Sequence, residues 1–249
     1  MDKLEKTNAD QTIDPNWTVY AAPLIAILQA AKQMDIDEQK LLSSIDLEIE
    51  HLNIPDRRFP VVQYFRLYQA ASDATGNLDI GLAVGRIIVL KGMNLQLYVA
   101  QVSNLLRDYL NLIPSLLKLR GDIGQINAYR HDQLVELRWE PLLRDTGGKR
   151  FFSDEMLSAA AAIINSLCVL EVPIVKAHFT YEKPRDDTRL KKKFGKDILF
   201  KQACSSLFLT LKPLTIRSSD RTIMKVQITI NHFENGLNMR NQETVCYLV

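Results

Sequence analysis

The chain has 249 residues, of which 47% are hydrophobic and 24% are charged, and its formal net charge is +2. A chain of this length and composition can bury a full hydrophobic core, which excludes a disordered protein. Its 31 basic and 29 acidic residues nearly cancel, so there is no overall field that would hold a polyanion.

Residues 1–16 are polar and mixed in charge, and we expect them to form a disordered N-terminus without a signal peptide. No uncharged apolar run reaches the roughly 18 residues that a membrane span needs. The cysteines Cys168, Cys204 and Cys246 follow neither a disulfide pattern nor a zinc-binding pattern. These features predict a soluble, cytoplasmic protein without a membrane partner.

The first half of the chain carries apolar residues spaced three and four apart, which is typical of amphipathic helices. Helices are predicted over residues 17–34, 37–45, 59–75 and 77–90, and two more between 93 and 119, the second starting near Ser103. Asp37 is placed to cap the second helix, Gly76 to end the third, and Pro114 to kink or split the last.

After residue 121 the apolar residues alternate instead, which predicts β-strands. Residues 125–130 and 133–139 form a predicted hairpin with Val135, Leu137 and Trp139 on one face. Strands are also predicted over 174–181 and 206–212. Beyond residue 213 the stretch 224–233 is strand-like, and Asn235-Gly236 is a turn signal.

Two helices interrupt these strands. Ser153 is predicted to cap a strongly apolar helix that extends to residue 170, with Asp154 and Glu155 in its first turn. Residues 186–194 form a short basic helix closed by Gly195. The order of helices followed by β-β-α-β-α-β predicts an α+β fold with a small, mostly antiparallel four-stranded sheet.

Several short segments occur in an order that resembles one family. They are LL at 41–42 with IDL at 45–47, DRRFP at 56–60, TGNLDIGL at 75–82, PIVKAHF at 173–179 followed by Pro184, FG at 194–195 with Phe200, and LKPL at 211–214. Together they resemble the N-terminal effector-binding and dimerisation domain of AraC/XylS transcription regulators, in the branch whose sensor is mainly helical. The resemblance covers roughly residues 20–214.

This resemblance implies an effector-binding and dimerisation domain over residues 17–214. It also implies a small organic effector, a homodimer or a mixed dimer with a full-length regulator, and DNA contact only through a C-terminal helix-turn-helix domain. No helix-turn-helix pair is evident in residues 215–249, which we expect to be a truncated linker or a poorly ordered tail. A truncated protein, a disrupted gene and a natural short form remain open.

Five residues are candidates for effector binding, and each has a structural alternative. Lys176 and His178, on the polar face of a strand, can anchor an anionic effector or form a solvated sheet face. Tyr129 and Trp139 can line an apolar pocket or belong to the core. Arg86 can pair with a ligand carboxylate or lie on the surface. We expect the pocket to lie between the helices and the sheet.

No catalytic site, metal site or cofactor is expected. Cys168 is the cysteine best placed to meet a histidine and a carboxylate, His178 and Asp186, but its apolar helix predicts an inert thiol. The histidines share no metal-ligand spacing, and phosphate-binding glycine loops are absent. The basic run at 189–196 is expected to be a solvated helix face. The alternative function is a stand-alone small-molecule-binding or protein-interaction module without DNA-binding activity.

Overall fold

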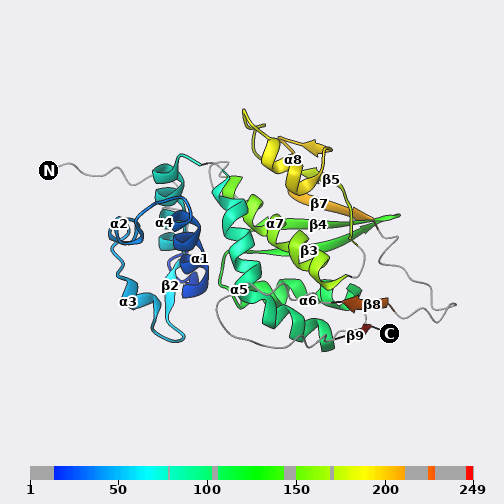
Figure 1. Cartoon of the computed structure of the whole chain (residues 1–249), viewed down its shortest axis with the longest axis horizontal. Helices are drawn as coiled ribbons and strands as arrows, with labels where there is room; N and C mark the ends of the chain where they lie inside the picture. Colours follow the sequence, from blue (N-terminus) through cyan, green and yellow to red (C-terminus); the bar gives the residue numbers. More distant parts are fainter. Residues whose placement is uncertain are drawn as a thin grey trace.

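The computed structural model describes residues 14–77, 79–102, 106–142, 150–168, 171–210, 224–227 and 245–248. The first four helices gather at one end of the molecule and a twisted sheet lies toward the other, with two long helices, α5 and α7, between them (Figure 1). The α+β class predicted from the sequence is confirmed. No helix in the described part of the chain is long and apolar enough to cross a membrane.

The N-terminal group consists of α1 (Ala21–Lys32), α2 (Glu38–Ser43), α3 (Ile49–Leu52) and α4 (Val61–Thr75). Two local predictions are confirmed: Asp37 caps α2 by accepting a hydrogen bond from Gln39 N at 2.8 Å, and Gly76 ends α4 at φ 59°. The prediction that the first helix begins at residue 17 is wrong. Thr18–Tyr20 is a strand, β1, which pairs antiparallel with β2 (Arg58–Pro60), a contact between segments that are distant in sequence.

The middle of the chain has fewer helices than predicted. Residues predicted to end one helix near residue 90 and begin another at 93 belong to a single helix, α5 (Ile80–Val102). Helix α6 (Leu106–Lys118) continues past Pro114, so the proline does not split it. Tyr109, Leu110 and Ile113 are buried on one side of α6, and this tertiary packing outweighs the lost backbone bond. Residues 103–105, where the second helix was predicted to begin, lie outside the described residues.

The main sheet has five strands in the order β3-β4-β7-β5-β6. The four predicted strands are present as β3 (Gly124–His131), β4 (Leu134–Pro141), β5 (Ile174–His178) and β7 (Ser205–Thr210). The prediction of a four-stranded sheet is wrong, because β6 (Ile198–Leu199) adds a fifth strand parallel to β5. Two residues are too few to show an alternating pattern. Separately, β8 (Met224–Gln227) pairs antiparallel with β9 (Val245–Leu248). The predicted turn at 235–236 lies outside the described residues.

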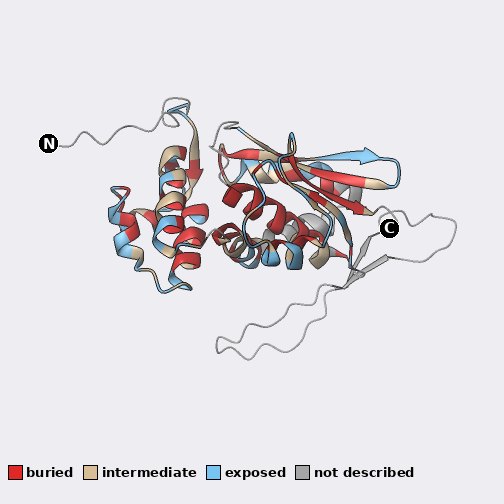
Figure 2. Cartoon of the chain, turned by 90° about the horizontal axis from the view of Figure 1, so that it is seen from above, coloured by how far each residue is buried: buried red, intermediate tan, exposed pale blue. Residues whose placement is uncertain are grey.

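Helix α7 (Arg150–Leu167) begins four residues earlier than predicted, so Ser153 is a buried residue inside the helix and not its cap. Helix α8 (Thr188–Phe194) follows β5, and Phe194 at its end is fully buried. Buried residues concentrate on α7 and on the sheet beside it (Figure 2). The inward face predicted for the hairpin is confirmed, since Val135, Leu137 and Trp139 are all buried.

The alternation expected of the predicted strand 174–181 is only partly observed. Ala177 and Phe179 are fully buried, but Val175 is 45% exposed. The pairing of β5 with β7 shifts register between Ile174 and Lys176, which is a bulge. A bulge inserts an extra residue and turns the side chains before it to a different face.

Two glycines allow α5 and α7 to pack closely. A Cβ atom on Gly81 would lie 2.3 Å from the carbonyl oxygen of Phe151. A Cβ atom on Gly85 would lie 2.3 Å from Ser158 Oγ and 2.7 Å from the carbonyl oxygen of Glu155. The four-residue spacing puts both glycines on one face of α5, the face that meets α7.

We therefore expect Gly85→Ala to lower the free energy of unfolding by about 1–3 kcal/mol, because the added methyl group overlaps backbone that cannot move freely. Chemical denaturation measures this change. Gly92→Ala in the same helix is the control: nothing lies within 4 Å of its added methyl group, and it should stabilise the helix by up to about 1 kcal/mol. Equal effects of the two substitutions would contradict the close contact.

Candidate functional site

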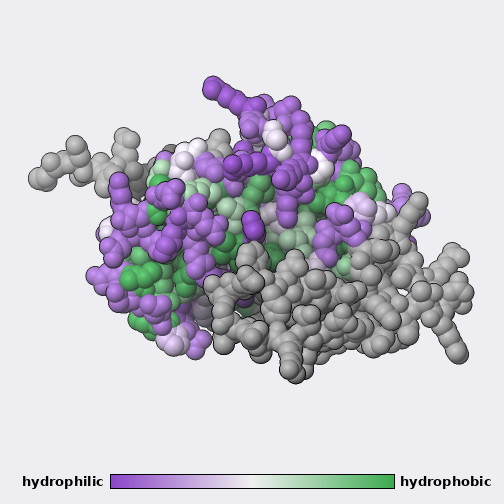
Figure 3. Space-filling view, in the orientation of Figure 1, coloured by the Kyte–Doolittle hydropathy of each residue, from purple (hydrophilic) through white to green (hydrophobic). Residues whose placement is uncertain are grey.

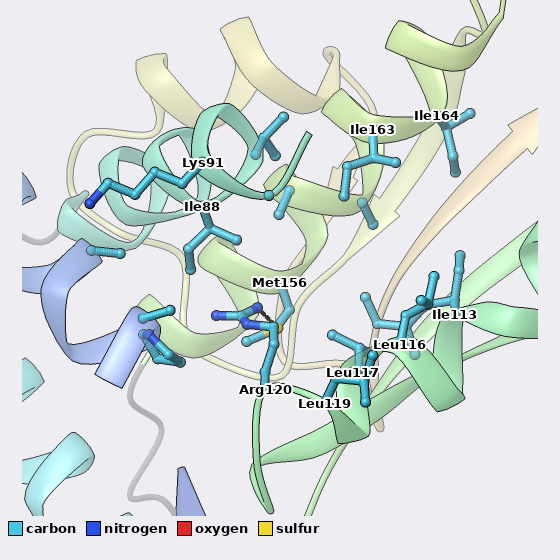
Figure 4. Close-up of a pocket in the computed structure, with 18 of the residues that line it drawn as sticks. Ile88, Lys91, Ile113, Leu116, Leu117, Leu119, Arg120, Met156, Ile163 and Ile164 are labelled. Carbon is cyan, nitrogen blue, oxygen red and sulfur yellow. Dashed lines mark hydrogen bonds between the residues drawn. The ribbon is translucent and has the colours of Figure 1, made fainter. Parts of the chain in front are cut away.

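A cavity of about 280 Å³ lies between α1, α5, α6, α7 and the start of β3. Its walls are mostly aliphatic (Figure 4). They include Ile88 from α5, Ile113 and Leu116 from α6, and Ile163 and Ile164 from α7. The cavity therefore lies among the helices, and the sheet contributes one wall residue, Ile126 of β3.

Small side chains at the helix contacts leave this space unfilled. Ala22 and Ala26 of α1, Gly92 of α5, and Ala159 and Ala160 of α7 all border the cavity. Residues 159–162 are four consecutive alanines in α7. Two of them, Ala159 and Ala160, form a wall of the cavity, because their short side chains leave a gap toward α1 and α6.

Among the described residues, three polar side chains border the cavity. Lys91 lies at its rim, and partial burial lowers the pKa of its ammonium group. Tyr109 is almost fully buried, and this burial raises the pKa of its phenol. Arg120 lies in the turn between α6 and β3, and its Nη1 is 3.5 Å from Met156 Sδ (Figure 4). The cavity thus offers a guanidinium, an ammonium group and a phenol in an otherwise apolar wall.

Arg120 also belongs to a buried hydrogen-bond network centred on Glu155 of α7, which has no exposed surface. Arg120 Nη2 donates to Glu155 Oε1 at 2.7 Å. Tyr64 and Tyr68 of α4 donate their hydroxyl protons to Glu155 Oε2 at 2.9 and 2.8 Å. Burial, together with the Glu155 carboxylate, raises the pKa of both phenols, which keeps them protonated as donors. Burial disfavours the charged form of Arg120, but the carboxylate outweighs it and raises the pKa of the guanidinium.

A second buried network surrounds the preceding residue, Asp154. Arg150 Nε donates to Asp154 at 3.0 Å, and the Tyr181 hydroxyl donates to its other oxygen at 2.5 Å. Arg150 also pairs with Asp79 before α5, and Asp79 lies 3.7 Å from Arg189 of α8. Burial raises the pKa of Asp154 to about 6, although Arg150 opposes the shift. The network joins α7 to α5, α8 and the segment after β5.

Asp154 and Glu155 were predicted to lie in the first turn of α7, where their negative charges would interact favourably with the helix dipole. Because α7 begins at Arg150, they lie in its second turn and are fully buried. Apart from Arg150, which lies one turn before Asp154 in the same helix, their partners come from α4, from the turn after α6 and from residue 181, and no local pattern in the sequence identifies these distant contacts. Breaking one partner of a buried ion pair leaves an uncompensated charge, which typically costs about 3–5 kcal/mol.

None of the five predicted site residues lines the cavity. Trp139 is buried on the inner face of the sheet. Lys176 and His178 come together around Phe208 of β7: the Lys176 ammonium lies 4.5 Å and the His178 ring 4.8 Å from its ring centroid. Their role in binding stays a prediction.

The other two candidates lie elsewhere. Tyr129 is on the edge strand β3, and its hydroxyl donates to Glu140 at 2.8 Å, while Arg138 lies over its ring. Arg86 is exposed on α5 and lies near Lys193 of α8. Burial of Lys193 lowers the pKa of that lysine, and the positive charge of Arg86 lowers it further. The residue that sequence reasoning missed is Arg120. Its one local signal is its position at the change from helical to alternating periodicity.

The chemical alternatives gain no support from the geometry. Cys168 is buried, and burial raises the pKa of its thiol to about 11, so the thiol is protonated near neutral pH. Among the described residues, no group of three or more His, Cys, Asp or Glu side chains could hold a metal ion. His232 and the side chain of Cys246 lie outside the part that the structure describes.

The basic residues of α8 gather on a hydrophilic face of the molecule (Figure 3). Lys191 pairs with Asp187 at 2.9 Å, and Arg189 lies 3.7 Å from Asp79. Part of the positive charge is therefore compensated within the fold, as expected of a solvated helix face.

Comparison with known proteins identifies one family model. Residues 36–214 match the model described as the arabinose-binding domain of AraC transcription regulator, N-terminal. Among solved structures, the transcriptional regulator CdpR from Pseudomonas aeruginosa is similar at 18% identity and a TM-score of 0.50, over 71% of this chain and 54% of that one. The chain thus spans about half the length of CdpR.

A second solved structure shows a weaker likeness. It is an oxygen-binding H-NOX domain related to soluble guanylate cyclases, at 12% identity and a TM-score of 0.47, over 78% of this chain and 96% of that one. A search of curated proteins finds no match to the chain.

The position of Asp154 predicts a specific pH dependence of stability. Its pKa is raised from 3.8 to about 6 in the folded protein, so its stabilising contribution is complete below pH 4 and is lost as the pH rises through 6. We expect the stability of Asp154→Asn relative to the unsubstituted protein to increase by about 2–3 kcal/mol between pH 4 and pH 7.5.

Denaturant unfolding at both pH values measures this difference. Asp73→Asn is the control, because it removes an exposed carboxylate from α4 and should show no comparable change. Parallel stability curves for Asp154→Asn and the unsubstituted protein would show that Asp154 titrates alike in the folded and unfolded states.

Proposed function

The chain belongs to the family of N-terminal arabinose-binding domains of AraC transcription regulators, and on that premise we propose that it senses a small organic effector for a bacterial regulator of this type. In this proposal the domain acts in the cytoplasm, and effector binding changes how the regulator controls transcription. The structural observation that carries the proposal is the cavity bordered by Arg120, since it joins a mainly apolar space to a partly buried cation.

The size and chemistry of the cavity favour a compact, mainly apolar effector. An apolar cavity of about 150 Å³ holds a benzene molecule, so the space of about 280 Å³ found here suits a molecule of roughly 10–15 non-hydrogen atoms. A sugar of that size carries several hydroxyl groups, and each would need a hydrogen-bond partner after leaving water. The aliphatic walls do not favour such a ligand, and we propose that the effector is not a free sugar despite the family's description.

The position of the cavity suits a sensor. It is bordered by α1 of the N-terminal group, by the central helices α5 and α7, and by α6, so one ligand touches elements from both ends of the domain. A ligand shifts a conformational equilibrium only by its difference in affinity for the two states. We propose that it binds better to one arrangement of these helices and so biases the geometry of a dimer.

The alternative is a stand-alone small-molecule-binding or protein-interaction module without a link to DNA binding. The same cavity supports it. Copurification of the chain with a full-length AraC-type regulator, from cells that express both, favours the regulatory proposal. An interaction confined to unrelated proteins favours the alternative.

A cavity-filling substitution tests the site. We expect butylbenzene to bind the unsubstituted protein and Ala160→Leu to weaken that binding by roughly 10–100-fold, because the larger side chain occupies the ligand's space. Ligand-observed NMR titration measures the affinity. Ala162→Leu is the matched control, since this half-buried alanine lies in the same helix but does not border the cavity, and it should bind normally.

Thermal unfolding of the free proteins distinguishes a blocked cavity from a damaged fold. Ala160→Leu should unfold at or above the temperature of the unsubstituted protein, because it fills empty space. If the unsubstituted protein does not bind butylbenzene, or if Ala160→Leu binds it equally well, the cavity is not the site for an apolar effector.

The dimer is tested by light scattering coupled to size exclusion at micromolar concentration. We expect a mass of twice the 28.4 kDa chain. A monomer at all accessible concentrations, with and without a bound ligand, would contradict dimerisation through this domain.

A further inference from the structure

Arg120 borders the cavity and also donates a hydrogen bond to the Glu155 carboxylate. The two terminal nitrogens of its guanidinium group have acceptors of different strength. Nη2 bonds a carboxylate oxygen at 2.7 Å, whereas Nη1 faces the thioether sulfur of Met156 at 3.5 Å. A thioether is a weak acceptor, and a guanidinium group has five N–H donors. An oxygen acceptor on a ligand that replaced the sulfur would form a stronger, charge-assisted hydrogen bond.

Glu155 has no exposed surface, so its negative charge depends on its three partners. Arg120 supplies the compensating charge through Oε1, and the hydroxyl groups of Tyr64 and Tyr68 donate to Oε2. If a ligand oxygen attracts the guanidinium, Glu155 loses part of its compensation and its bonds to the phenols change. Both phenols belong to α4, which does not border the cavity.

The backbone around Arg120 is also hydrogen-bonded toward the N-terminal helices. The Arg120 carbonyl oxygen accepts a hydrogen bond from Tyr20 N of β1 at 3.1 Å, and Asp122 Oδ2 accepts one from Thr18 N at 2.9 Å. The turn that holds Arg120 is thus bonded to the small β1–β2 sheet that precedes α1 and α4. Movement of this turn reaches the N-terminal helices by a second route.

From these contacts, and resting on the function proposed above, we propose that Arg120 recognises an acceptor oxygen of the effector and reports the occupancy of the cavity to α4 through Glu155, Tyr64 and Tyr68. The effector class this implies is a compact apolar molecule with one carboxylate or carbonyl oxygen. Arg120 then has two roles: its Nη1 edge selects the ligand, and its Nη2 edge couples the ligand to the buried network.

Two probes that differ by one carboxylate separate recognition from simple filling of the cavity: butylbenzene and 4-butylbenzoate. Hydrogen exchange of the α4 amides, followed by mass spectrometry at saturating probe, reports the coupling. In the unsubstituted protein we expect α4 to exchange roughly threefold or more faster with 4-butylbenzoate than with butylbenzene, because the carboxylate draws Arg120 away from Glu155.

Arg120→Met alone would leave the fully buried Glu155 carboxylate without its compensating cation, so recognition is tested with Arg120→Met and Glu155→Gln combined. The glutamine side-chain oxygen can still accept from the tyrosine hydroxyl groups. We expect this double variant to bind butylbenzene normally, while its affinity for 4-butylbenzoate relative to butylbenzene falls roughly tenfold or more.

Glu155→Gln alone is the matched variant that tests whether Glu155 couples the cavity to α4. It keeps Arg120 and its binding of 4-butylbenzoate, but the two probes should then give nearly equal exchange in α4, because no buried charge at residue 155 depends on the guanidinium.

The outcomes distinguish this inference from the proposed function. If neither probe binds the unsubstituted protein, the proposed apolar sensor site fails. If both bind but α4 exchanges equally in the two complexes, the cavity stands and the coupling is overturned. An unchanged preference for 4-butylbenzoate in the double variant overturns the recognition role of Arg120.

Discussion

The burial of Glu155 is the constraint on which the arrangement of this domain depends. A carboxylate without exposed surface is tolerated only if donors surround it, and here these donors come from α4 and from the turn after α6. Satisfying one side chain therefore fixes two parts of the chain, α4 and the turn that holds Arg120, relative to α7. Its partners Tyr64 and Tyr68 also pack their rings against Phe152 of α7, so apolar burial and charge compensation hold the same contact.

The cavity follows from how α7 is held. On one side Gly85 brings α5 to within a distance that no side chain would allow. On the cavity side Ala159 and Ala160 are too short to reach α1 and α6, and the networks of Asp154 and Glu155 keep the helix from moving to close the gap. An unfilled apolar space lowers stability, since the wall atoms lack contact partners. A ligand that fills it binds the folded state and stabilises it by mass action.

The features that were predicted correctly from the sequence are local ones. Asp37 and Gly76 act within two or three residues of their own positions, and the alternation of Val135, Leu137 and Trp139 is a property of one strand. The errors arise where distant segments decide the outcome. The Glu155 carboxylate accepts a hydrogen bond from Tyr64, 91 residues away, and β1 pairs with β2 and with the turn after α6, both distant in sequence. The candidate ligand residues that were chosen from strand patterns lie away from the cavity for the same reason. The sequence of a single strand does not show which helices will enclose a cavity.

The adjacency of Asp154 and Glu155 shows how a single helix turn can serve two ends of the domain. Neighbouring residues on an α-helix point about 100° apart, so Asp154 turns toward Arg150 and Tyr181 while Glu155 turns toward α4 and Arg120. Each carboxylate has its own arginine and its own phenol donor or donors, so α7 carries two compensated charges that do not share a partner. A ligand beneath this turn can alter one network directly while the other keeps α7 attached to α5 and α8. Under the proposal that a ligand engages Arg120, only the Glu155 network responds directly, because the compensation of Asp154 does not involve Arg120.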